Sequence, residues 1–179
     1  MGKFDKFKVE LRGMTAPTAT LEMDIDNTFF ANIDGPEVQK GKAKVVTTVT
    51  KKQDAFDIYF DIEGTVIVLC DRCLDEMEQP IATTGLLSVK LGDDFGEEGD
   101  TVVVPERDGF INVAWYIYEF VALAIPMKHV HAPGKCNRSM QDELRKHIVD
   151  EGDEDMPEGK ADSGETDPRW DALKEIMDN

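Results

Sequence analysis

Three cysteines and two histidines are the residues of this chain whose types and spacing favour chemistry. Cys70 and Cys73 form a Cys-x-x-Cys pair, and His131 and Cys136 follow about sixty residues later. Thiolate sulfur and imidazole nitrogen are the donors that tetrahedral zinc prefers, and a tight turn can direct two such thiolates at one ion. If the fold joins the two stretches, the four donors close the coordination shell. We therefore predict a structural zinc site without an open catalytic position.

Two other interpretations of these residues stay open. His129 lies two residues before His131, so either ring is a candidate ligand. Alternatively, the three cysteines pack as small apolar residues and the histidines are solvated. A thioredoxin-like redox pair is less favoured, because Cys70 follows a β-rich stretch instead of starting a helix, and Asp71 opposes thiolate formation.

The charge of the chain is strongly acidic but unevenly distributed. The net charge is −17, and residues 150–179 hold twelve acids against three bases. Such a surface repels a phosphate backbone as a whole and suits a basic protein partner. A local exception is the stretch 120–141, which contains no acid and carries Lys128, Lys135 and Arg138. Arg72 joins them if the two cysteine stretches meet, which predicts a phosphate-binding patch, against the simpler interpretation of an ordinary solvated surface.

Several classes of protein are disfavoured by the sequence. The most apolar stretch, 110–126, is shorter than a membrane span and contains Asn112 and Glu119, so we expect a buried helix there. An odd number of cysteines and no signal-peptide pattern favour a reducing, cytoplasmic location. No phosphate-cradling glycine loop or nucleophile elbow is present. We expect no enzyme activity and no small-molecule substrate.

Hydrophobic periodicity predicts an α+β fold, with a mainly antiparallel sheet over residues 1–105 followed by helices. Strands are expected at 4–11, 18–25, 42–50, 56–69, 81–91 and 101–104. Helices are expected at 27–33, 113–125 and 138–149. We expect residues 1–149 to form one domain in which the strand 56–69 delivers Cys70, while the loop after the helix ended by Pro126 delivers the histidines.

The C-terminal thirty residues have a different character. Residues 150–166 are acidic and poor in large apolar groups, which predicts a flexible linker. Residues 167–179 predict a docking helix, because Trp170, Leu173, Ile176 and Met177 share one face.

Three ordered motifs resemble the YceD family of large ribosomal RNA subunit accumulation proteins. They are Cys70-Asp71-Arg72-Cys73-Leu74, the stretch 126–131 that leads to Cys136, and the stretch 167–173 (DPRWDAL). The N-terminal Gly-Lys-Phe-Asp-Lys and the long acidic linker resemble bacteroidete-type members.

The resemblance implies a non-enzymatic bacterial protein of the cytosol that supports accumulation of large-subunit (23S) ribosomal RNA. It carries over Cys70, Arg72 and Cys73, together with His131 and Cys136. We expect the protein to bind ribosomal RNA, a large-subunit ribosomal protein, or both. The alternative is an acidic, chaperone-like adaptor for a basic ribosomal protein that makes no RNA contact and depends on Trp170.

Overall fold

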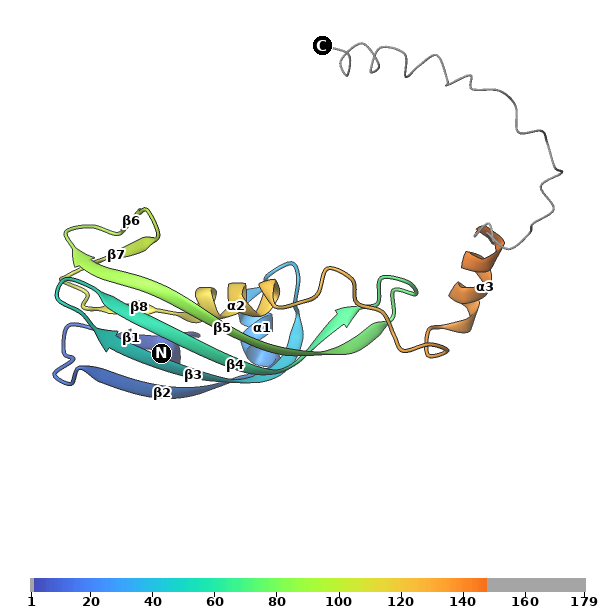
Figure 1. Ribbon diagram of the computed structural model, residues 1–179, viewed down its shortest axis with the longest axis horizontal. Coiled ribbons are helices and arrows are strands. Elements are labelled where there is room, and N and C mark those ends of the chain that lie inside the picture. The colour runs from blue at the N-terminus through green and yellow to red at the C-terminus, as the bar shows by residue number, and fades with distance from the viewer. Residues whose placement is uncertain (1, 148–179) are drawn as a thin grey trace, which may run out of the picture. The chain divides into compact units, whose positions relative to one another are not determined.

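A mixed six-stranded sheet dominates the computed structural model, which describes residues 2–147 (Figure 1). The strand order is β2-β3-β4-β5-β7-β6, and every neighbouring pair is antiparallel except β5 and β7. The strands are β2 (Thr18–Ile25), β3 (Lys40–Lys51), β4 (Phe56–Leu69), β5 (Glu76–Gly92), β6 (Gly96–Glu98) and β7 (Thr101–Pro105). The expected α+β class is confirmed.

Smaller elements complete the described part of the chain. A short helical turn, η1 (Asp5–Phe7), replaces the first half of the strand expected at 4–11. The remaining elements are a two-stranded sheet of β1 (Lys8–Glu10) and β8 (Phe110–Asn112), and the helices α1 (Asn27–Ile33), α2 (Ala114–Leu123) and α3 (Arg138–His147). None of the helices within residues 2–147 is long and apolar enough to cross a lipid bilayer.

The chain divides by its contacts into Met1–Asp142 and Glu143–Asn179. Of the second unit, the structure describes only the last part of α3. The predicted linker at 150–166 and the docking helix at 167–179, with Trp170, lie outside the described residues. The predicted boundary of the domain at residue 149 stays a prediction.

The sheet has one covered face because apolar residues recur at every second position of its central strands. Val45 of β3 lies opposite Ile62 of β4, and both are fully buried. The covering layer is α1, α2 and the β1–β8 pair, whose apolar side chains join the same core. Figure 1 shows α1 and α2 along this face of the sheet.

A glycine permits close packing of α2 on the sheet. The Phe120 ring of α2 lies where a Cβ at Gly85 of β5 would come within 2.5 Å of it. Phe120 also packs against Phe60 of β4, with ring centroids 5.4 Å apart. Two residues earlier, the Tyr118 hydroxyl oxygen accepts hydrogen bonds from the Glu37 and Val38 amides at 3.0 and 3.3 Å. These contacts fix α2 between the sheet and the segment before β3.

The outward side of α2 differs from expectation. We expected this apolar helix to be covered on most sides, but Trp115 and Leu123 are 49% and 82% exposed. Together with Glu119 they form an exposed stripe at intervals of four residues. At the start of the helix, the Asn112 side-chain oxygen accepts a hydrogen bond from the amide of Ala114, the first helical residue, at 3.0 Å.

The hairpin of β4 and β5 positions the cysteine pair. Its register runs from Phe56 opposite Val89 to Leu69 opposite Glu76. Residues 70–75 therefore form the turn at one end of two long strands (Figure 1). The same β5 strand leads at its other end into the acidic stretch after Gly92.

Candidate metal centre

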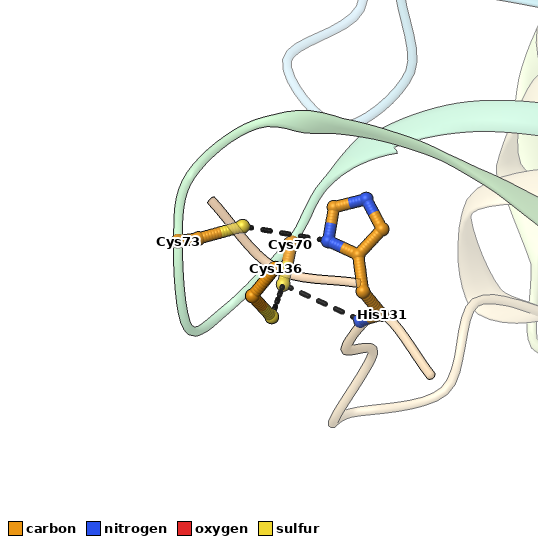
Figure 2. A group of neighbouring side chains, drawn as sticks. All are labelled: Cys70, Cys73, His131 and Cys136. Carbon is orange, nitrogen blue, oxygen red and sulfur yellow. Dashed lines mark hydrogen bonds between the residues drawn. The ribbon is translucent and has the colours of Figure 1, made fainter. Parts of the chain in front are cut away.

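Four side chains from two distant segments converge at the turn of this hairpin (Figure 2). Cys70 and Cys73 come from the β4–β5 turn, and His131 and Cys136 come from the loop between α2 and α3. Their donor atoms all lie within 4.8 Å of one another. The three cysteines are buried, and their sulfurs are not joined in disulfides. The sequence-predicted set of four is brought together in full.

The spacing of the donors fits a tetrahedral ion. The sulfurs of Cys70 and Cys136 are 3.9 Å apart, and the Cys73 sulfur is 3.4 Å from His131 Nδ1. Zinc bonds of about 2.3 Å to sulfur and 2.0–2.1 Å to nitrogen give tetrahedral edges of about 3.8 Å and about 3.5 Å. The geometry is therefore compatible with a metal bound by three sulfurs and one nitrogen. A disulfide would need a sulfur separation of about 2.05 Å.

The turn that holds the first two cysteines closes on itself. The Cys70 amide donates to the Asp75 carbonyl at 2.9 Å, and the Leu74 amide donates to the Cys70 carbonyl at 2.8 Å. Leu74 occupies the left-handed region with a φ of 60°. This conformation costs a residue with a Cβ atom about 1–2 kcal/mol. Its side chain is 63% exposed, so packing of that side chain does not hold the turn. The backbone hydrogen bonds do, and they place Cys70 and Cys73 on the same side.

Backbone amides shape the ionisation of the sulfurs. Burial opposes ionisation of Cys70, but N–H groups of His131, Arg72 and Cys73 directed at its sulfur lower the pKa of this thiol to about 6. Burial raises the pKa of Cys136, and the adjacent Cys70 and Cys73 raise it further. A thiolate is thus favoured at Cys70, and ionisation of Cys136 is opposed. A cation among the sulfurs would remove this conflict.

His129 has a separate position from His131. Its backbone carbonyl accepts from the Asp71 amide at 3.0 Å, and its amide donates to Asp71 Oδ2 at 2.7 Å. Its ring lies near the Pro126 carbonyl oxygen and 3.5 Å from Asp71 Oδ1. His129 therefore joins the loop to the cysteine turn without contributing to the cluster. The sequence did not predict that Asp71 would bind His129. The available signal was the position of Asp71 between the two cysteines.

Apolar side chains limit access of water to the sulfurs. Met77 from the start of β5, Val130 from the loop and Met140 from α3 pack against the three cysteines. Val130 lies between the two histidines in sequence. Three consecutive residues of the loop therefore have different contacts: His129 binds Asp71, Val130 packs on the cysteines, and His131 belongs to the donor cluster. Apolar surroundings have a low dielectric constant, so electrostatic interactions between the donor atoms and a bound ion would be stronger there than in water.

Four basic residues flank the donors in sequence, on the hairpin turn and on the stretch from the α2–α3 loop to the start of α3, and all are exposed: Arg72, Lys128, Lys135 and Arg138. Within residues 2–147 none of them lies within 4 Å of a carboxylate. Two lysines of β3 differ, since Lys40 pairs with Glu76 at 2.6 Å and Lys44 pairs with Glu22 at 2.7 Å. The four basic residues of the predicted binding set therefore lie close in sequence to the four donors. Trp170, the fifth residue of that set, lies outside the described residues.

Comparison with known proteins yields one match. A family model described as large ribosomal RNA subunit accumulation protein YceD matches residues 58–177. The matched stretch includes β4 from Ile58 onward, the hairpin turn and the loop that bears His131 and Cys136. No curated protein and no solved structure matches the chain.

Proposed function

The chain belongs to the YceD family of large ribosomal RNA subunit accumulation proteins, and from this membership we propose that it acts in ribosome biogenesis by binding and not by catalysis. The family description names a role in accumulation of large-subunit ribosomal RNA. The proposed mode of action is contact with 23S ribosomal RNA in the cytoplasm through the region around the metal centre.

The metal in this proposal is a structural zinc ion held by Cys70, Cys73, His131 and Cys136. The separations of the donor atoms support it, as does the combination of thiolate and imidazole ligands. Three thiolates and one imidazole fill a tetrahedral shell, so no position is left for a reacting water. The ion would join the β4–β5 turn to the α2–α3 loop and hold both in one arrangement.

One observation carries the RNA contact: the four exposed basic side chains lie on the two segments that the ion would join. In an otherwise acidic protein, cations without carboxylate partners in the described part of the chain are available to phosphate oxygens. The acidic stretches elsewhere in the chain would be repelled by the RNA, which favours approach by this end of the molecule. Fixing both segments reduces the entropy lost when several phosphates are bound at once.

Anisotropy titration of a labelled 23S fragment over a salt series tests this function. We expect the Lys128→Ala/Lys135→Ala variant to reduce the slope of log K against log salt by about 1.5, since each phosphate contact contributes about 0.7–0.9. The matched control is Lys3→Ala/Lys51→Ala, which removes the same charge from exposed positions far from the cluster. Equal losses in both variants, or no affinity in the unmodified protein, would contradict direct RNA contact.

The second candidate is an acidic, chaperone-like adaptor for a basic ribosomal protein without RNA contact. The net charge of −17 favours it. This candidate predicts that Trp170→Ala/Leu173→Ala abolishes capture of a purified basic ribosomal protein. It also predicts that the Lys128→Ala/Lys135→Ala variant captures that protein normally.

A further inference from the structure

An aromatic groove lies at the end of the β4–β5 hairpin that is far from the metal centre. It has a volume of about 720 Å³ and lies between the turn before β6, the turn after β7 and the first turn of α2. Phe95 and Trp115 line it and are 68% and 49% exposed. The 17 residues of β5 separate the two ends by about 50 Å of strand. Figure 1 shows β6, β7 and β8 at one end and the cysteine turn at the other.

Trp115 is held rigidly although half of it is exposed. Its indole N–H donates to Glu119 Oε1 at 2.7 Å, one turn along α2. Its ring packs on Tyr118 with centroids 5.5 Å apart, and Tyr118 is itself anchored by two backbone amides. A rigid, exposed tryptophan next to a cavity loses little entropy when a ligand covers it, which is the usual character of a binding hot spot.

The surroundings of the groove are acidic. Residues 92–112 contain seven acids and a single base, Arg107. That arginine crosses to Asp94, with a closest separation of 3.8 Å, and Asp108 also lines the groove. Burial, followed by the charges of Glu97 and Glu119, raises the pKa of Tyr116, another lining residue. The groove therefore repels anions and favours a cationic ligand.

The groove already contains an example of a cation on an aromatic ring. The Lys8 ammonium lies 4.8 Å from the ring centroid of Phe110, within the range of a cation–π contact. Trp115 and Phe95 offer further ring surface that no cation of the described residues covers. A planar guanidinium suits such surfaces better than an ammonium, because it stacks on rings and pairs with a carboxylate through two N–H groups.

We propose that this groove binds an arginine-rich segment of a partner protein. Its arginines stack on Trp115 and Phe95 and pair with Asp94 and Asp108, displacing Arg107. The inference rests on the proposed function and deepens it, because it assigns the protein partner to the acidic end and leaves the basic end to RNA. The net charge of −6 over residues 92–112 makes an RNA occupant unfavourable here.

Tryptophan fluorescence tests the proposal on the full-length chain. The chain has two tryptophans, so a Trp170→Phe background leaves Trp115 as the reporter. The probe is a nine-arginine peptide, compared with nine-lysine and nine-glutamate peptides and with an oligouridylate. We expect saturable change of Trp115 emission with the arginine peptide, several-fold weaker binding of the lysine peptide, and no response to the anionic probes.

Variants separate the groove from general charge attraction. Asp94→Asn/Asp108→Asn and, separately, Phe95→Ala should each weaken the arginine peptide about tenfold. The matched control Glu63→Gln/Glu78→Gln removes two exposed charges of the sheet and should weaken it less than twofold. The proposal would be overturned if both charge-removing variants weakened binding of the arginine peptide equally, or if oligouridylate bound more tightly than the peptide. It would also be overturned if Trp115 emission changed with protein concentration in the absence of peptide, which would indicate a second copy of the chain in the groove.

Peptide binding by the groove and RNA binding by the basic end can be tested separately. Lys128→Ala/Lys135→Ala should leave peptide affinity unchanged, and Asp94→Asn/Asp108→Asn should leave the salt slope of RNA binding unchanged. Loss of both activities in either variant would show that the two ends are not independent and would overturn the assignment of one partner to each.

Discussion

Removing the metal should lower the free energy of unfolding by an amount that depends on the length of the loop closed by the metal. The paired donors lie 58 residues apart for Cys73 and His131, and 66 apart for Cys70 and Cys136. In the chain-entropy model, one cross-link closing a loop of this length contributes about 4 kcal/mol at 25 °C. For a chain of this size that corresponds to a fall in Tm of roughly 8–16 °C.

The assay is unfolding in urea and by heat, with free zinc buffered at a fixed level and then removed by chelator. Since bound metal stabilises by mass action, the zinc level must be the same for every variant. Cys73→Ser in zinc should reproduce the loss seen in the unmodified protein with chelator. Adding chelator to Cys73→Ser should then change nothing further, because the same cross-link is already absent.

Two histidines provide the matched control. His131→Ala should lower the free energy of unfolding and release the metal, whereas His129→Ala should retain one equivalent of metal and lose only the contacts with Asp71. If chelator leaves the unfolding curve unmoved, or if both histidine variants behave alike, the four side chains do not act as a cross-link and the reasoning is refuted.

Three further predictions concern packing and backbone. Gly85→Ala should lower the free energy of unfolding by about 1–3 kcal/mol, because the new Cβ would meet the Phe120 ring; urea unfolding measures this, and Phe120→Leu should restore part of the loss. Leu74→Gly should leave metal content unchanged and raise stability by up to about 1 kcal/mol in urea, since glycine tolerates the positive φ; a loss of metal would contradict it. Tyr118→Phe should cost about 1–3 kcal/mol by the same assay, because the buried Val38 amide loses its acceptor; an unchanged midpoint would show that water replaces the hydroxyl.

The strands that carry the metal centre could be predicted because their periodicity is local. β2 and β4 have the bounds that alternation predicts, 18–25 and 56–69, and β4 delivers Cys70 at its end. β5 begins at Glu76, five residues before the expected start at 81, and it runs through Pro80. Its first residues are polar or interrupted by proline, so only pairing with β4 makes them a strand. The parallel pairing of β5 with β7 likewise depends on tertiary contacts.

The choice between the two histidines could not be made from sequence. It depends on Asp71, which engages His129 across 58 residues and thereby leaves His131 to face the cysteines. The aromatic groove was also beyond prediction, because Phe95 lies in an acidic stretch and Trp115 lies in a helix whose sequence is apolar at nearly every position. Bringing those rings together requires the fold, whereas a Cys-x-x-Cys pair shows its chemistry in the sequence itself.

Zinc X-ray absorption on the purified full-length protein tests the central claim most directly. The account predicts one zinc per chain with a first shell of three sulfurs at about 2.3 Å and one nitrogen at about 2.0 Å. In His131→Ala the metal should be lost, while His129→Ala keeps the original shell. The account would be contradicted if protein purified in the presence of zinc contained no metal, or if the ligands of the zinc were oxygen and nitrogen alone.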